Sequence, residues 1–242
     1  MNQNSHIPSR RTATFTGVFL LLFTILSALH FTLIELKLIV VDDIEPIVAF
    51  IQQQELLFRF GIVLDLTLFT CGIAAVLALY ALLRTQHEHF ARFALICMVI
   101  QATLSIAIEL SSLLALLLVS GGNTVAAFEP KQLHALLGLV LQTRAAAYTV
   151  VILFFSIGMS VFSFLLLKSK LVPSLIAVTG LLSFVVMLVA TLAGLLTPAN
   201  TPLAANIVLA GQSFATLAMV FQLVLGGWLI GKGAGRRALG MA

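Results

Sequence analysis

Six apolar stretches, each about twenty residues or longer, lie between the few charged residues of this 242-residue chain. A stretch of that length matches the ~30 Å hydrocarbon core of a bilayer. A helix also satisfies its own backbone hydrogen bonds where no water is present. The sequence therefore predicts an all-α membrane protein, a bundle of six transmembrane helices within a single integral membrane domain at 1–242. The predicted spans are 14–34, 60–83, 93–119, 145–167, 171–197 and 206–230.

Composition excludes several other classes of protein. Hydrophobic residues make up 61% of the chain and charged residues 9%, against about 45–50% and about 25% in soluble domains. A transmembrane barrel would show alternation over ~10-residue strands, which these runs lack. The net charge of +4 does not indicate a nucleic-acid partner, because the basic residues lie at the ends of the apolar stretches and form no single patch. The expected partner is the lipid bilayer, and no protein partner or ligand is identified.

The distribution of lysine and arginine predicts the orientation, because positive residues are retained on the cytoplasmic side. The side that holds both termini carries nine of them, and the opposite side carries four. Both termini are therefore predicted to be cytoplasmic. The nine are Arg10, Arg11, Arg84, Arg92, Lys168, Lys170, Lys232, Arg236 and Arg237, and the four are Lys37, Arg59, Lys131 and Arg144.

The two long outer loops share a pattern. Glu45-Pro46 and Glu129-Pro130 each precede a mostly apolar segment, an arginine, a span and a basic exit, with offsets of 84 or 85 residues. A proline suits the first turn of a helix, so short interfacial helices are predicted in both loops. The pattern indicates a parallel internal duplication of 45–85 and 129–169, with chance as the alternative, because membrane rules alone place basic residues at helix ends.

Ionisable residues inside the spans mark the candidate site, because such groups are costly in hydrocarbon and usually face a bundle interior. Asp65 and Glu109 are two such acids, both in the outer half of their spans. Glu109 belongs to a stripe of polar residues at helical spacing that should point inward. Its other members are Gln101, Ser105 and Ser112.

Other polar residues near the outer ends of the spans complete a predicted outward-opening pocket. The full candidate set for a ligand or ion is Asp65, Glu109, Arg59, Arg144, Gln212 and His30, with Tyr148 beside them. Glu109 would be paired with Arg59, paired with Arg144, or protonated and neutral. The sequence does not decide among these three states. The alternative is that these residues only hydrogen-bond between helices and fix their packing.

Small residues predict where the last two spans pack closely, among them Gly180, Gly211 and Gly226. Gly227 and Gly231 form a G-x-x-x-G pair that is expected to pack locally. No catalytic motif is complete. His87-Glu88-His89 lacks the H-E-x-x-H spacing, and Gly211-Gln212-Ser213 is not the full G-x-S-x-G elbow. The chain is therefore expected not to be an enzyme, and to have no cofactor and no metal.

The carboxyl half contains Leu167-Lys168-Ser169-Lys170-Leu171-Val172-Pro173, then Gly180-Leu181, and finally Trp228-Leu229-Ile230-Gly231-Lys232-Gly233. With these residues the chain resembles the bacterial membrane-protein family catalogued as domain of unknown function 4386. Arg59 and the exit Leu82-Leu83-Arg84 extend the resemblance over most of the chain. It implies a six-helix protein of the bacterial cytoplasmic (inner) membrane, and it supplies no catalytic residues.

Two functions remain open at this point. One is a noncatalytic membrane module with a sensing, stabilising or accessory role. The other is a small-molecule or ion transporter, or a permeability protein, that uses Asp65 and Glu109 in an outer-half polar cavity. The first is the default hypothesis, because no broken helix or midplane chain of charges marks a transport path.

Overall fold

The computed structural model describes residues 10–38, 44–121, 125, 128–198 and 201–232. It contains six helical segments that are long and apolar enough to cross a bilayer. They cover the six predicted apolar stretches, so the prediction of six long apolar helices is confirmed. The first segment, Arg10–Leu38, comprises α1 (Arg10–His30), a π-helical turn η1 (Phe31–Glu35) and α2 (Leu36–Leu38). A short helix, α3 (Glu45–Gln53), follows it. The other five spans are α4 (Glu55–Leu83), α5 (Glu88–Ser120), α6 (Pro130–Ser169), α7 (Ser174–Leu196) and α8 (Pro202–Lys232).

Most of these helices are longer than the apolar stretches that predicted them. The 40 residues of α6 extend for ~60 Å at 1.5 Å per residue, about twice the thickness of the hydrocarbon core. The fifth helix is shorter than predicted at its start. Lys170 adopts the left-handed conformation that ends α6, and α7 begins only after Pro173. Leu171 and Val172 therefore lie in the turn, outside the predicted 171–197 helix.

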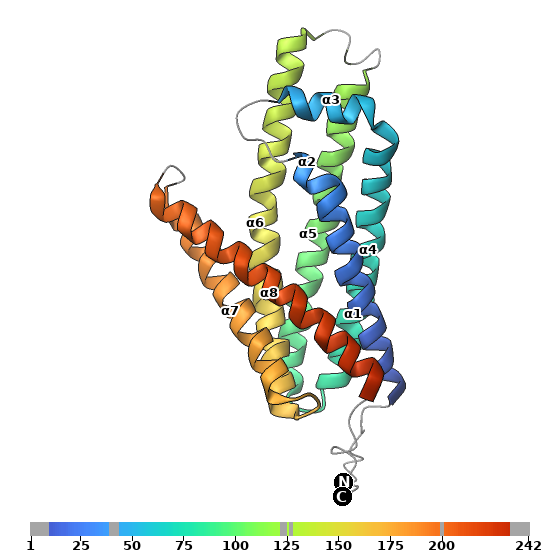
Figure 1. The fold of residues 1–242 in the computed structure, drawn as a ribbon, viewed down its shortest axis with the longest axis vertical. Coiled ribbons are helices and arrows are strands. Elements are labelled where there is room, and N and C mark those ends of the chain that lie inside the picture. Colours follow the sequence, from blue (N-terminus) through green and yellow to red (C-terminus); the bar gives the residue numbers. More distant parts are fainter. Residues whose placement is uncertain (1–9, 39–43, 122–124, 126–127, 199–200, 233–242) are drawn as a thin grey trace, which may run out of the picture.

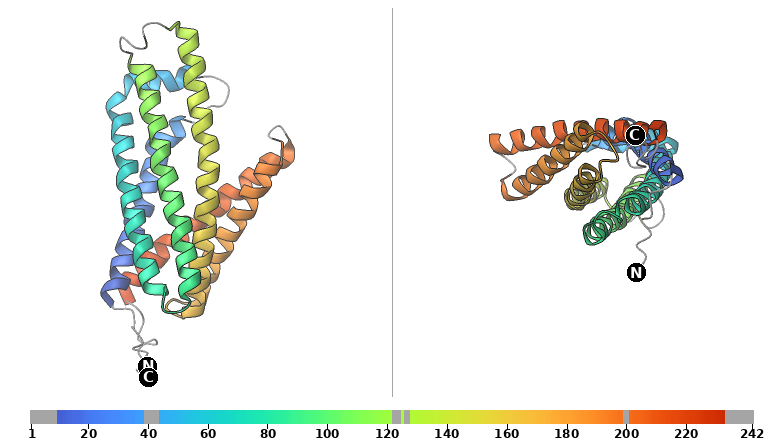
Figure 2. Two further views of the ribbon diagram at one scale, coloured as in Figure 1. Left: turned by 180° about the vertical axis from the view of Figure 1, so that it is seen from behind. Right: turned by 90° about the horizontal axis from the view of Figure 1, so that it is seen from below.

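The six spans pack in a closed ring. Each one contacts the next along the chain, in the order α1, α4, α5, α6, α7 and α8, and α8 returns to pack on α1. The helix α1 begins and α8 ends at the same end of the bundle, which we call the terminal end; the opposite end, with α3, is the loop end (Figure 1). From behind, α5 and α6 stand side by side, while the α7–α8 hairpin leans away from them toward the loop end (Figure 2).

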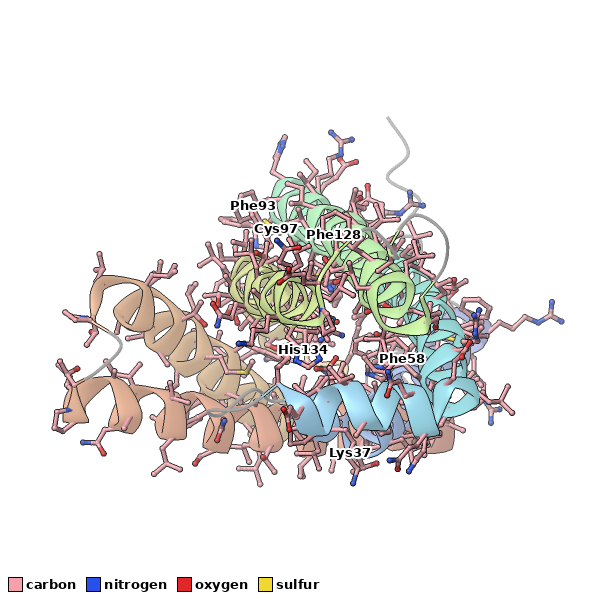
Figure 3. The ribbon with its side chains drawn as sticks, turned by 90° about the horizontal axis from the view of Figure 1, so that it is seen from above. Lys37, Phe58, Phe93, Cys97, Phe128 and His134 are labelled. Carbon is pink, nitrogen blue, oxygen red and sulfur yellow. The ribbon has the colours of Figure 1, made fainter. Side chains whose placement is uncertain are left out.

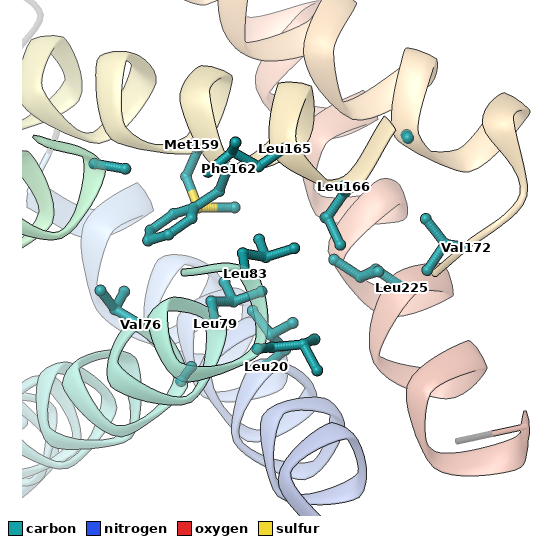
Figure 4. Close-up of a cluster of buried hydrophobic side chains, with 14 of the residues drawn as sticks. Leu20, Val76, Leu79, Leu83, Met159, Phe162, Leu165, Leu166, Val172 and Leu225 are labelled. Carbon is teal, nitrogen blue, oxygen red and sulfur yellow. The ribbon is translucent and has the colours of Figure 1, made fainter. Parts of the chain in front are cut away.

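Two apolar cores hold the ring together. The larger core fills the terminal half and joins all six spans through fully buried side chains such as Phe162, Leu79 and Leu225. Part of it is seen in Figure 4, where residues of α1, α4, α6 and α8 point into one space. The smaller core lies at the loop end and gathers Ile34, Leu38, Ile47, Ile51, Phe58, Ala115, Leu116, Leu137 and Leu141.

The loop-end core explains the position of α3. This short helix lies across the loop end beside α4 and α5 (Figure 3), and its buried residues Ile47 and Ile51 belong to the smaller core. The second long loop differs from the first. Pro130 there is the first residue of α6 itself, which begins with a capping box between Glu129 and Gln132. In the described part of this loop there is accordingly no separate helix, and the internal duplication stays a prediction.

Glycines decide where the α7–α8 hairpin contacts its neighbours. A Cβ atom on Gly180 would lie 2.5 Å from the ring of Phe221, so the ring packs directly on the α7 backbone. A Cβ atom on Gly17 would lie 2.6 Å from the carbonyl oxygen of Gly226, which makes this pair the crossing point of α1 and α8. The prediction of local packing for Gly227 and Gly231 is wrong. Beyond the adjacent residues and backbone of α8 itself, no described atom lies within 4 Å of a Cβ built at either position, because both face away from the ring.

Candidate functional site

A layer of buried charged residues separates the two apolar cores. His30 on α1, Asp65 on α4, Glu109 on α5 and Arg144 on α6 each lie, along their own helix, between residues of the larger core and residues of the smaller one. All four are buried; Asp65 is 2% exposed and Arg144 5%. Four mostly apolar spans thus each bring one buried ionisable residue to the same level of the bundle.

Arg144 forms a bidentate ion pair with Glu35. Its Nη1 donates to Glu35 Oε2 at 3.0 Å, and its Nη2 donates to Glu35 Oε1 at 2.5 Å. The guanidinium also lies over the ring of Tyr148, with its carbon 4.9 Å from the ring centroid. Glu109 Oε1 is farther away, 3.8 Å from Nη2. The planar guanidinium matches a carboxylate at both oxygens, so the pair fixes the geometry between η1 and α6.

His30 and two acids make up the other half of the cluster. The Nδ1 atom of His30 lies 3.1 Å from Asp65 Oδ1 and 3.9 Å from Glu35 Oε1. The carboxyl groups of Asp65 and Glu109 adjoin each other. Asp65 Oδ2 and Glu109 Oε1 are buried and have no hydrogen-bond partner among the described residues. Because two ionised carboxylates only accept hydrogen bonds, a bond between these acids requires a proton on one of them.

The π-helical turn places Glu35 in this cluster. Within η1 the amide of Leu36 donates to the carbonyl of Phe31, five residues back. A π-helical turn holds more residues than an α-helical turn, so residues five apart come closer to the same face than they do in an α-helix. His30 and Glu35 are five residues apart and both reach the same charged layer. The irregular turn is thus the local feature that adds a third carboxyl group to the site.

A cavity of about 400 Å³ adjoins the charged layer, between α1 and η1, α4, α5, α6, α7 and α8. Glu35, Asp65 and His30 line it at one end, and most of its remaining wall is apolar. Thr24 and Gln222 close another side, where the Thr24 hydroxyl donates to Gln222 Oε1 at 2.9 Å. The aromatic lining residues are Phe23, Phe31, Phe69, Tyr148 and Phe155.

The structure brings together four of the six predicted site residues, His30, Asp65, Glu109 and Arg144. The predicted polar stripe of α5 also faces inward, because Gln101, Ser105, Glu109 and Ser112 are all buried. Of the two pairings left open for Glu109, its arginine neighbour is Arg144.

Arg59 and Gln212 are not part of the site. Arg59 is exposed and pairs with Glu55 one helical turn away, at 2.7 Å. Gln212 is exposed on α8, and Gln222, ten residues further on, reaches the cavity instead. Sequence reasoning missed Glu35 and Gln222. Gln222 could have been found, because it is a polar residue inside an apolar span. Glu35 could not, because regular helical spacing does not place it on the same face as His30.

His30, Glu35 and Asp65 also present donor atoms that could bind a metal ion. One atom from each lies within 4.8 Å of the others, and one imidazole nitrogen with two carboxylate oxygens is a donor set that transition metals use. Glu35, however, is engaged by Arg144 at both oxygens. A metal ion here would meet the charge of that guanidinium, so the donor set fits a metal only if Arg144 moves.

The fold and the site define a multi-pass helical membrane protein with a charged layer at mid-bundle. A family model described as domain of unknown function DUF4386 matches residues 15–233. The chain belongs to this family, as its resemblance in the carboxyl half predicted. No curated protein and no solved structure matches the chain.

Proposed function

We propose that this protein is a noncatalytic binding module of the bacterial cytoplasmic membrane, which holds a small molecule in the cavity between its spans. The observation that carries the proposal is the position of three ionisable residues, His30, Glu35 and Asp65, on the wall of that cavity. Pockets of 300–1,000 Å³ with an apolar lining and a few convergent polar groups are typical small-molecule sites. A purely structural role would favour pairing every buried acid with a base, whereas the buried carboxyl group of Asp65 lies beside a second acid, Glu109.

Binding is favoured over transport by the packing of the terminal half. Below the charged layer, the larger core fills the bundle with side chains such as Phe162, Leu79 and Leu83, each at most 1% exposed. A solute that entered the cavity would have to separate these side chains to cross to the terminal end. The geometry therefore supports a site with access from one side, as a sensing or accessory module needs.

The orientation is part of the proposal. Arg10, Arg11, Arg84 and Arg92 lie at the terminal end of the bundle or in its turns, and positive residues favour the cytoplasmic side. We place both termini in the cytoplasm, so the loop end with α3 faces outward. The cavity then lies on the outer side of the larger core.

Transport remains the second candidate, and one observation favours it. The α7–α8 hairpin contributes Met187, Ala218 and Gln222 to the cavity wall, yet it leans away from α5 and α6 toward the loop end (Figure 1). A hairpin that packs closely at one end only is an element that could rock against the rest of the ring. Uptake into proteoliposomes that depends on Asp65 would favour transport over simple binding.

Binding is tested on the purified protein in lipid nanodiscs with three aromatic probes of similar size. Benzyl alcohol is neutral, benzoate is an anion and benzyltrimethylammonium is a cation. Ligand-observed NMR measures their binding, with empty nanodiscs subtracted to remove partition into lipid. We expect at least one probe to bind the protein, because a mostly apolar cavity of about 400 Å³ accommodates a single benzene ring with a small head.

Two phenylalanine variants of α1 locate the binding. Ser27 lines the cavity, so Ser27→Phe should fill it and abolish probe binding. Leu22 is 41% exposed and does not line the cavity, so Leu22→Phe should bind like the wild type. Failure of all three probes to bind the wild type, or equal binding by both variants, would show that the cavity is not a ligand site.

A further inference from the structure

We infer that the ligand of this cavity is an organic cation, whose positive charge lies against Asp65 and whose apolar part lies among the aromatic side chains. The inference rests on the proposed binding function and adds the chemical class of the ligand. It follows from the charge of the buried layer, from which acids face the cavity, and from the nature of the remaining wall.

The buried layer has more acidic than basic groups. Glu35, Asp65 and Glu109 face one guanidinium, that of Arg144, and one imidazole, that of His30. If all three acids were ionised and His30 neutral, the layer would have two uncompensated negative charges. Such charge is costly in a medium that excludes water, so without a cation the adjoining acids Asp65 and Glu109 share a proton, and a cation in the cavity would take the place of that proton. A ligand that brings a positive charge would therefore bind more favourably than a neutral ligand of the same shape.

The cavity exposes the acids and not the arginine. Asp65 and Glu35 line its wall, whereas Arg144 and Glu109 lie behind them and are not lining residues. Both oxygens of Glu35 accept hydrogen bonds from Arg144. Asp65 has no arginine partner; its Oδ1 lies 3.1 Å from His30 Nδ1, and its other neighbour is a second acid, Glu109. Asp65 is thus the group that a cation in the cavity would contact.

The rest of the wall suits an organic cation better than a bare metal ion. Phe23, Phe69 and Phe155 line the cavity together with Tyr148, and aromatic faces attract quaternary ammonium groups through their quadrupole. A metal ion would use only the donor atoms at one end, next to the Arg144 charge. It would leave most of the 400 Å³ unfilled. An aromatic ammonium ion uses both ends of the cavity.

The experiment compares two ligands of the same shape that differ in charge. Benzyltrimethylammonium carries a nitrogen cation, and neopentylbenzene has a carbon atom in place of that nitrogen. Isothermal titration calorimetry measures the affinity of each for the wild-type protein in nanodiscs, after correction for partition into empty nanodiscs. We expect the cation to bind at least tenfold more tightly. This comparison needs no variant and so does not depend on the folding of one.

A charge-removing variant then assigns the effect to Asp65. Asp65→Asn keeps the side-chain shape and removes the charge. We expect this variant to lower the affinity for benzyltrimethylammonium at least tenfold, while the affinity for neopentylbenzene changes little. Glu88→Gln is the matched control, because Glu88 is an exposed acid that pairs with Arg92 outside the site. That variant should bind both ligands like the wild type. Elution of the nanodiscs as one symmetric peak in gel filtration shows that each variant is folded.

The other outcomes separate this inference from the proposed function. Equal affinity for the two isosteres, or binding of benzyl alcohol or benzoate alone, would overturn the cation inference and leave the binding function intact. Absence of binding by every probe would overturn both. Zn²⁺ binding that is lost in His30→Gln, with no binding of benzyltrimethylammonium, would assign the site to a metal ion and would also overturn the inference.

Discussion

Removal of the Arg144 side chain should destabilise the protein far more than removal of an exposed arginine. In Arg144→Met, the unbranched apolar side chain occupies part of the space and removes both hydrogen bonds to Glu35. Glu35 then stays in the bundle beside Asp65 and Glu109 with no arginine in the layer. Breaking a buried ion pair from one side costs about 3–5 kcal/mol. Because the Glu35 side chain is still 24% exposed and so is partly hydrated, we expect a value near the lower limit, ~3 kcal/mol.

The measurement is the free energy of unfolding in mixed micelles titrated with dodecyl sulfate. Arg59→Met is the matched control, because Arg59 also pairs with a glutamate, but both partners are largely exposed, at 56% and 43%. Exposed pairs contribute roughly 0–1 kcal/mol. We therefore expect the two arginine variants to differ by at least ~2 kcal/mol.

A double-mutant cycle isolates the pair itself. Glu35→Gln alone should cost less than Arg144→Met, because Arg144 keeps Glu109 at 3.8 Å as a second partner. In the double variant Glu35→Gln/Arg144→Met no ionised Glu35 is left without its arginine. The cost should therefore be clearly smaller than the sum of the single costs. A coupling energy below about 0.5 kcal/mol, or equal costs for Arg144→Met and Arg59→Met, would refute this account of the charged layer.

Three further predictions follow from the same structure. Gly226→Leu should lower the unfolding free energy by about 1–3 kcal/mol, because a Cβ there would lie 2.8 Å from Leu21. Gly227→Leu, with no described atom within 4 Å, should change it little; equal losses would show that α1 and α8 do not cross at Gly226. The double variant Asp65→Asn/Glu109→Gln should keep or raise the unfolding free energy in the same titration, because it removes buried acids and leaves the Arg144 pair with Glu35 intact. A large loss of unfolding free energy with no change in probe binding would assign both acids a structural role. Reporter fusions to either end of the chain should be active only in the cytoplasm, and opposite sides for the two ends would contradict the six-span topology.

The helices were predictable because each depends on information local in the sequence. A run of about twenty apolar residues specifies a span wherever it occurs, and the stripe from Gln101 to Ser112 fixes which face of α5 points inward. The helix ends were less predictable. Whether the chain beyond Pro130 forms its own helix or extends α6 depends on packing against the loop-end core, which the residues near Pro130 do not encode.

The site was partly predictable for the same reason. Asp65 and Glu109 stand out because an acid in an apolar span has few stable places except the bundle interior. Glu35 does not stand out, because in a regular helix it would face away from His30. Arg59 and Arg144 look alike in sequence, each near the outer end of a span. Only the contacts separate them, since Arg59 turns to Glu55 on its own helix and Arg144 meets Glu35 from another.

The sequence by itself determined that the chain suits a lipid bilayer, how many spans it has, and that two acids lie inside apolar spans, where contact with lipid is costly. It could do so because burial of apolar runs in a bilayer depends on composition and length alone. The tertiary structure alone decided which charges meet. The closed ring of six helices, the π-helical turn at Phe31–Glu35 and the glycine contact of α1 with α8 set the distances between charged residues up to 109 positions apart in the chain. Ion pairs and cavities depend on distances of a few ångströms between helices, and those distances are fixed only when the helices pack.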